Sequence, residues 1–304
     1  MATLIVSGLI NIETTVRIDG FPLAYSPVLY PFGGVYSGVS GVGMNLALAF
    51  KSLGDEVRFL SMIGGDPAGD GVMAALAAAG IGASRVVRAL PETPHSAILY
   101  DPDGRRQIHV DLKDIQERRY PAVAFEAAAG GADAACLCNI NFNRDLLPLA
   151  RARGLPVFCD VHVLRDPRDA YNADFMAAAE LIFMSDEGLW APPEEAAREL
   201  LGLYPARAVV VGLGAKGALF VERGRPALTA PALRPRPIIS TIGAGDALFS
   251  SFCHYYIRGR APEEALSLAT AFAGWKIGEA GAARGFLSEH ELETLVRRAH
   301  KGDL

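Results

Sequence analysis

The sequence of 304 residues has only four cysteines, no excess of positive charge and no long apolar run. Its 29 Lys and Arg residues against 34 Asp and Glu residues give a formal net charge of −5, so no basic field attracts nucleic acid or anionic lipid. No apolar run reaches membrane-spanning length. The N-terminus lacks the basic segment of a signal peptide, and Gly8 and Asn11 interrupt the apolar residues there. We expect a cytoplasmic protein with neither a nucleic-acid nor a membrane partner.

The cysteines do not have the spacing of a metal site. Cys136 and Cys138 alternate on an expected strand, while Cys159 and Cys253 lie in apolar surroundings. A zinc site would need C-x-x-C spacing and a second pair of ligands. Buried, reduced thiols are therefore predicted.

The chain does contain a repeated alternation of short apolar strands and helices. Strands are expected at 3–8, 57–63, near 136, and at 157–160, 181–184 and 208–211. Helices are expected at 44–52, 146–153, 171–179, 193–203, 247–257, 262–277 and 289–301. The alternation predicts a three-layer α/β/α fold, in which helices cover both faces of a central, mostly parallel sheet.

Two segments interrupt this alternation. Residues 12–41 show no helical pattern, and 96–100 with 107–111 are typical of a hairpin around Asp101-Pro102-Asp103-Gly104. We predict a small β-sheet lid, at about 12–40 and 93–112, that covers ligands at the carboxyl ends of the parallel strands. Because the sequence has no repeats and no linker, residues 1–304 are expected to form a single domain with this lid.

A glycine-rich turn, Gly243-Ala244-Gly245-Asp246, leads directly into an expected helix. Small residues let the chain approach an anion closely, and unpaired N–H groups of a first helical turn favour negative charge. Asp246 in the same turn places a carboxylate beside that anion, where it can accept a proton from a hydroxyl. An Asp that only stabilises the helix dipole is the structural alternative, and spacing alone leaves both open.

Two further glycine clusters are candidates for binding phosphate or hydroxyl groups. Residues 212–217 fit G-x-G-x-x-G, but a strand pattern at 218–222 follows instead of a helix, which excludes a dinucleotide fingerprint and leaves a plain hairpin loop as the alternative. Residues 38–45 lead into a helix, and Asn45 both donates and accepts hydrogen bonds, which suits a polyol. Here the structural alternative is Ser40 as the N-cap, with glycines packed against a sheet.

Together these segments resemble the ribokinase-like, or PfkB, family of carbohydrate and nucleoside kinases. The C-terminal family signature is similar to residues 241–248, and the N-terminal one to 41–47 followed by Leu53-Gly54. The family's G-x-D-x-x-G segment is similar to 64–69 and its nucleotide-side loop to 212–218. These matches occur in the family's order and cover essentially the whole chain.

The resemblance implies transfer of the γ-phosphoryl group of ATP, with Mg²⁺, to a hydroxyl of a sugar or sugar-like molecule. Asp246 would be the base, and the backbone of Gly243, Ala244 and Gly245 would hold the transferred phosphate. The residues implied on the acceptor side are Asn11, Glu13, Gly41, Gly43 and Asn45. Those implied on the nucleotide side are Ser185, Gly212, Gly214, Lys216 and Gly217, with Lys216 either a phosphate contact or a solvated loop residue. A nucleoside acceptor, including pseudouridine, and a catalytically weak nucleotide or sugar sensor stay open as alternatives.

Three positions depart from the family pattern. Glu13 stands where relatives usually carry an Asp that binds acceptor hydroxyls, so the identity of the acceptor stays open. Residues 184–188 replace the N-x-x-E motif that organises magnesium, and Asp186 or Glu187 is expected to substitute as the metal ligand. Ser240 stands where potassium-activated relatives often have Asp, which leaves the monovalent-cation requirement open. An exposed lid sheet also favours a homodimer through the lid.

Overall fold

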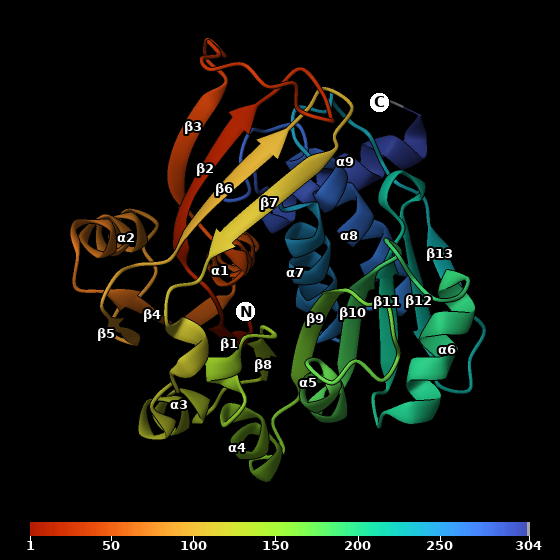
Figure 1. Cartoon of the computed structure of the whole chain (residues 1–304). Helices are drawn as coiled ribbons and strands as arrows, with labels where there is room; N and C mark the ends of the chain where they lie inside the picture. The colour runs from red at the N-terminus through yellow and green to blue at the C-terminus, as the bar shows by residue number, and fades with distance from the viewer. Residues whose placement is uncertain (303–304) are drawn as a thin grey trace.

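The computed structural model describes residues 1–302. Its centre is a nine-stranded sheet (Figure 1). The strand order is β13-β12-β11-β10-β9-β8-β1-β4-β5. The strands are β1 (Thr3–Ser7), β4 (Glu56–Gly64), β5 (Val86–Leu90), β8 (Ala134–Leu137), β9 (Val157–Val163), β10 (Leu181–Ser185), β11 (Ala208–Gly212), β12 (Ala218–Glu222) and β13 (Leu228–Ala230). From β5 across to β11 all neighbours are parallel, while β12 and β13 pair antiparallel at one edge.

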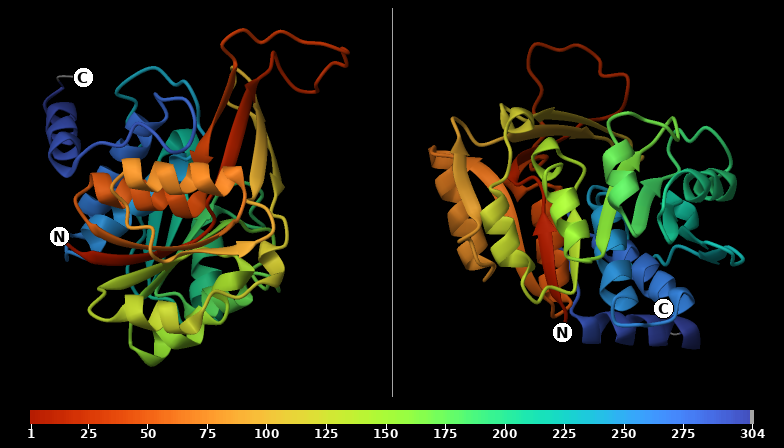
Figure 2. Two further views of the ribbon diagram at one scale, coloured as in Figure 1. Left: turned by 90° about the vertical axis from the view of Figure 1, so that its left-hand side faces the viewer. Right: turned by 90° about the horizontal axis from the view of Figure 1, so that it is seen from below.

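Helices cover both faces of this sheet (Figure 2). Their bounds are α1 (Val42–Ser52), α2 (Pro67–Ala78), α3 (Ala122–Ala129), α4 (Leu146–Ala152), α5 (Ala173–Ala178), α6 (Pro193–Leu203), α7 (Ala244–Tyr256), α8 (Pro262–Lys276) and α9 (Glu289–Lys301). Helix α7 packs against both α1 and α8, and α9 packs on α8. The parallel strands are apolar on both faces, as β11 shows with Val209, Val210 and Val211 fully buried, because helices exclude water from each side. The predicted three-layer α/β/α fold is confirmed.

A separate sheet of order β3-β2-β6-β7 forms the predicted lid. Its strands are β2 (Asn11–Arg17), β3 (Val35–Ser40), β6 (His95–Tyr100) and β7 (Arg106–Asp111). The 96–111 hairpin is confirmed, because β6 and β7 pair antiparallel around the turn at Gly104. The segment between β2 and β3 forms a loop that projects away from the body of the molecule (Figure 2).

The start of helix α1 differs from the structural alternative given above for Ser40. The N-cap is Gly41, with φ 105°, and no side chain caps the helix. The Ser40 hydroxyl instead lies 3.1 Å from Glu13 Oε2 and 3.2 Å from Asn45 Oδ1. Ser40 therefore links the lid to α1 rather than capping α1.

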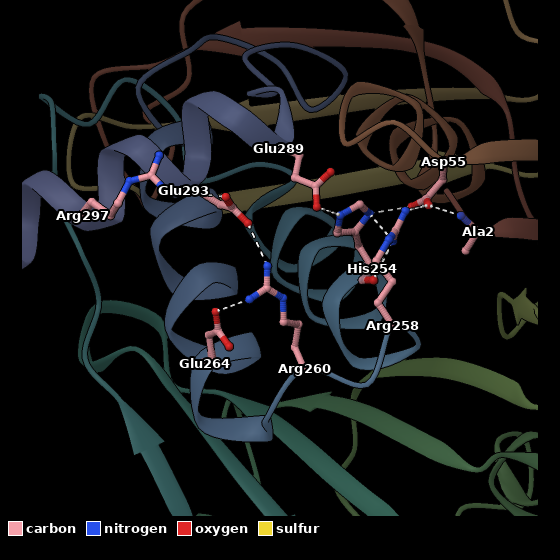
Figure 3. A network of polar contacts seen from close by, with 9 residues as sticks. All are labelled: Ala2, Asp55, His254, Arg258, Arg260, Glu264, Glu289, Glu293 and Arg297. Carbon is pink, nitrogen blue, oxygen red and sulfur yellow. Dashed lines mark hydrogen bonds and ion pairs between the residues drawn. The ribbon is translucent and has the colours of Figure 1, made fainter.

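A buried polar network anchors the C-terminal end of α7 (Figure 3). The Asp55 carboxylate follows α1 and accepts hydrogen bonds from Ala2 N (3.2 Å), His254 Nδ1 (2.7 Å) and Arg258 Nη2 (2.5 Å). Burial of Asp55 acts to raise the pKa of its carboxyl group, but the bonds from His254 and Arg258 hold that pKa below its ordinary value. The network thus ties the first strand and α1 to α7.

We predict that Asp55→Asn lowers the free energy of unfolding by about 3 kcal/mol at neutral pH, because it leaves Arg258 without its carboxylate. Since the pKa of Asp55 is depressed, its contribution is present above the ordinary carboxyl pKa and is lost as pH falls through the folded value. Denaturant unfolding at several pH values measures this. The matched control is Glu264→Gln, which breaks the exposed pair with Arg260 (Figure 3) and should cost under about 0.5 kcal/mol. Equal losses in the two variants would contradict the prediction.

Candidate active site

A cavity of about 950 Å³ lies at the carboxyl edge of the parallel strands, under the lid. Its walls come from the ends of β9, β10 and β11, from the first turn of α7 and from the lid side chains Ile98, Ile108 and Val110. Ligand sites of open α/β sheets are expected at this edge, outside the carboxyl ends of the strands. The small four-stranded sheet therefore contributes side chains to the same cavity.

The first turn of α7 presents N–H groups that have no protein acceptor. Gly243 is the N-cap, with φ 78°, and the Ala244 N–H is donated to Thr241 O at 3.2 Å. The N–H groups of Gly243, Gly245 and Asp246 have no acceptor within residues 1–302. Because Gly243, Ala244, Gly245 and Asp246 all line the cavity, this turn is a suitable binding place for an anion.

Asp246 lies in this turn with its carboxylate largely withdrawn from solvent. Its Oδ2 accepts a hydrogen bond of 2.7 Å from Asn45 Nδ2, which α1 places opposite it. Burial raises the pKa of the Asp246 carboxyl group, and the bond from Asn45 and the charge of His162 only partly oppose that shift. A carboxylate with a raised pKa is a better proton acceptor than an exposed one.

Four of the five acceptor-side residues predicted from the sequence line the cavity, and the fifth, Gly43, does not. The four are Asn11, Glu13, Gly41 and Asn45. Asn11 Nδ2 donates to Ser96 Oγ at 3.1 Å, while its buried Oδ1 has no hydrogen-bond partner among the described residues.

Glu13 and Gly43 each make contacts within the protein: Glu13 is hydrogen-bonded and Gly43 is closely packed. The Glu13 carboxylate accepts hydrogen bonds from Ser40 Oγ and from Ala282 N, and burial raises its pKa. Gly43 does not line the cavity: a Cβ there would lie 2.6 Å from the carbonyl carbon of Gly8. Gly43 is thus required for packing between α1 and β1.

Four of the five nucleotide-side residues predicted from the sequence line the cavity. Ser185 at the end of β10 lines it together with Asp186 and Glu187, as do Gly212 at the end of β11 and Gly214 and Gly217 in the loop that follows. Residues 218–222 form β12, antiparallel to β11, so 212–217 is a hairpin loop and the exclusion of a dinucleotide fingerprint is confirmed. Lys216 is exposed and does not line the cavity.

Two further cavity residues, Asp160 and His162, were not predicted as site residues. His162 has φ 58°, a left-handed conformation that is costly for a residue with a side chain and is typical of functional sites. Its Nδ1 lies 3.4 Å from Asp160 Oδ2. Burial acts to lower the pKa of His162, but the Asp160 carboxylate raises it to about 9, which favours the charged ring. The available sequence signal was two polar residues at the end of a buried parallel strand.

Lys276 was also not predicted. It ends α8, its side chain is fully buried, and its ammonium donates to the carbonyl oxygens of Ile242 and Gly281. Burial lowers the pKa of Lys276 to about 8, against the opposing effect of the Asp246 and Glu13 carboxylates. A lysine in the last turn of a helix is usually solvated, so no sequence signal marked it.

Protein side chains alone do not enclose a metal ion in the described chain. No cluster of three or more His, Cys, Asp or Glu residues in 1–302 is arranged for it. All four cysteines are buried and form no disulfide, as the sequence predicted.

Mg²⁺ commonly takes only one or two carboxylates together with phosphate oxygens, so Asp186 and Glu187 in the cavity lining are compatible with it. None of the described helices is both long and apolar enough to cross a membrane.

The chain is similar in sequence to a family of carbohydrate kinases and to individual named proteins. The model of the pfkB family carbohydrate kinases matches residues 1–290. Acarbose 7(IV)-phosphotransferase of Actinoplanes sp. is 26% identical over 278 residues, which cover 88% of this chain and 91% of that protein. The bifunctional protein HldE of Pseudomonas aeruginosa is 27% identical over 85% of this chain, which spans 56% of the HldE length.

Solved structures of the same fold extend over the whole chain. The microbiome-derived acarbose kinase Mak1 has a TM-score of 0.86 at 24% identity, with 98% of this chain and 99% of that chain covered. Arabidopsis thaliana ribokinase, in complex with ribose and ATP, has a TM-score of 0.81 at 20% identity and the same coverage. The chain therefore belongs to the pfkB family of carbohydrate kinases. It is a phosphotransferase with an alcohol group as acceptor.

Two glycines of the α7 turn should respond differently to an added methyl group. Gly243 needs a positive φ, and its Cβ would lie 3.0 Å from Ala282 Cα, so Gly243→Ala should lower the free energy of unfolding by about 1–3 kcal/mol. A Cβ on Gly245 meets nothing within 4 Å, so Gly245→Ala should fold normally or gain about 0.5 kcal/mol. Denaturant titration of both variants measures this. A Gly245→Ala loss as large as that of Gly243→Ala would contradict the view that position 245 is kept open for a ligand.

Proposed function

We propose that this chain transfers the γ-phosphoryl group of ATP to a hydroxyl of a sugar-like acceptor, with Asp246 as the general base. The observation that carries this proposal is the first turn of α7, where a buried carboxylate and unpaired N–H groups share one cavity. A proton acceptor and an anion site in one turn are what in-line phosphoryl transfer requires.

Asp246 removes the acceptor proton. Asn45 occupies its Oδ2, which leaves Oδ1 to face the hydroxyl. As the proton moves to the carboxylate, the hydroxyl oxygen forms a bond to the γ-phosphorus while the bond to the ADP leaving group breaks. The raised pKa of Asp246 favours proton uptake.

The charge that develops on the phosphoryl group is stabilised by the chain itself. The N–H groups of Gly243, Gly245 and Asp246 donate to its oxygens at the positive end of the α7 dipole. The His162 imidazolium, held by Asp160, adds a positive charge at the same cavity. Asp186 or Glu187 would hold Mg²⁺, which when bound neutralises phosphate charge.

The acceptor side supports a polyhydroxylated substrate. The unpartnered Oδ1 of Asn11 can accept a hydrogen bond from a hydroxyl, and a buried oxygen left unpaired is costly. The acarbose phosphotransferase of Actinoplanes sp. is consistent with an oligosaccharide-like acceptor. A nucleoside is the second candidate, because Ile98, Ile108 and Val110 give the lid an apolar cavity wall that suits a base.

An ATP-consumption screen over monosaccharides, acarbose-like oligosaccharides and nucleosides, including pseudouridine, tests the proposal. Turnover of a polyol is expected. Asp246→Asn should then reduce kcat about 100-fold or more, with ATP affinity by calorimetry changed little. The control Asp174→Asn alters an exposed carboxylate and should leave kcat unchanged.

Full activity of Asp246→Asn would show that another group is the base. ATP binding without turnover of any acceptor would favour a nucleotide or sugar sensor instead.

We also propose a homodimer through the lid. The β2–β3 loop exposes Leu23, Tyr25, Tyr30 and Phe32, with Tyr25 94% and Phe32 86% accessible, and so large an apolar surface is typical of an interface. Light scattering should give the mass of two 32.2 kDa chains. Tyr25→Ser with Phe32→Ser should shift that mass to one chain. A wild-type protein that stays monomeric at high concentration would contradict the dimer.

A further inference from the structure

The Lys276 ammonium is coordinated by main-chain carbonyls rather than by a carboxylate. Nζ donates to Ile242 O and to Gly281 O, the latter at 2.5 Å, and Lys276 forms no ion pair with the residues described. The side chain is 0% exposed. Fully buried lysines are rare and strongly desolvated, so such a position indicates a specific role for the charge.

The two carbonyls belong to the Ile242–Gly243 and Gly281–Ala282 peptide units. The N–H group at the other end of each unit points toward the site. In a planar trans peptide, the C=O and the following N–H point in opposite directions. The ammonium on Ile242 O therefore directs the Gly243 N–H away from itself, and Gly243 lines the cavity. The ammonium on Gly281 O likewise directs the Ala282 N–H, which donates to the Glu13 carboxylate of the lid.

These peptide units also pack against each other. A Cβ on Gly243 would lie 3.0 Å from Ala282 Cα, and Ile242 and Ala282 form a small apolar cluster with Ile98 of the lid. The carbonyl ends of both units point at one spot and would repel each other without a positive charge between them. A single cation thus fixes the anion-binding turn and the lid contact together.

We propose that Lys276 is a built-in monovalent cation that orients the 242–243 and 281–282 peptide units, so that the active site needs no potassium or other alkali ion. A monovalent charge bound by carbonyl oxygens is what a potassium ion would supply. Lys276 touches neither acceptor nor phosphate, and is therefore a positioning residue. Its effect on rate rests on the proposed phosphoryl transfer, whereas its effect on cation binding does not.

The surrounding charges are consistent with a charged Lys276 at neutral pH. Asp246 and Glu13 lie on its cavity side and Glu279 beyond α8, while Arg236 is the opposing cation. The neighbouring Ser240 is uncharged and buried, and donates its N–H to Ile277 O at 3.0 Å. The Lys276 ammonium thus supplies positive charge near the buried carboxylates of Asp246 and Glu13.

The test compares Lys276→Ala with Lys276→Met in chlorides of potassium, ammonium, propylammonium and tetramethylammonium. Ala opens space for a small cation to reach the two carbonyls, whereas Met fills the space of the stem without a charge. We expect the Tm of Lys276→Ala to be lowest in tetramethylammonium and to rise by about 2–4 °C with the smaller cations. Lys276→Met should not respond, and neither should wild type or the control Lys51→Ala, which alters an exposed lysine at the end of α1.

Turnover gives the second readout, with the acceptor found in the screen. In tetramethylammonium, Lys276→Ala should lose about 100-fold in kcat with little change in KM for ATP, because an oriented N–H donor is lost from the phosphate site. Potassium, ammonium or propylammonium should raise the kcat of Lys276→Ala by at least about tenfold over its value in tetramethylammonium. A purely structural lysine would give neither cation-specific restoration nor a loss confined to kcat.

Three results would overturn the proposal: stimulation of wild type by potassium over tetramethylammonium, undiminished kcat of Lys276→Ala in tetramethylammonium, or a Lys276→Ala Tm that ignores all three small cations. If Lys276→Ala does not fold in any salt, the wild-type comparison decides, with potassium independence supporting the proposal. If no acceptor is turned over, the Tm series still decides it, which separates its failure from failure of the proposed kinase activity.

Discussion

The burial of the Asp246 carboxylate at the start of α7 is the constraint on which the arrangement of the site depends. A desolvated carboxylate costs free energy, and here that cost is offset by the Asn45 amide, the α7 dipole and the charges of His162 and Lys276. These groups come from α1, β9 and α8, which meet only in the packed fold. The surroundings that set the pKa of Asp246 therefore exist only where the α/β core has formed.

Helix α7 connects the site to the rest of the core. Its far end is fixed by the buried Asp55 network, and its length is packed against α1 and α8. The lid also meets the turn of α7: Thr241 Oγ1 donates to Gly104 O at 3.3 Å, and Arg106 Nη1 donates to Thr241 Oγ1 at 3.3 Å.

Local sequence signals predicted the parts of the site that depend on local structure. The turn at 243–246 precedes a helix, and the hairpin after residue 212 follows from strand and turn chemistry, so both could be read from neighbouring residues. Lys276 could not, because its burial depends on the carbonyls of Ile242 and Gly281 rather than on its own helix. The left-handed backbone of His162 and the packing of Gly43 on Gly8 are likewise tertiary properties.

Glu13 shows how a departure from a family pattern is accommodated. Its carboxylate reaches both the Ser40 hydroxyl and the Ala282 N–H, so it joins the lid to the loop that Lys276 holds from the other side. A carboxylate engaged in this way has less capacity to accept acceptor hydroxyls. The free hydrogen-bond acceptor on this wall is instead Asn11 Oδ1, which is buried and unpartnered among the described residues. This wall therefore offers a hydroxyl donor the oxygen of a neutral amide, while Glu13 connects the lid to the loop at Ala282.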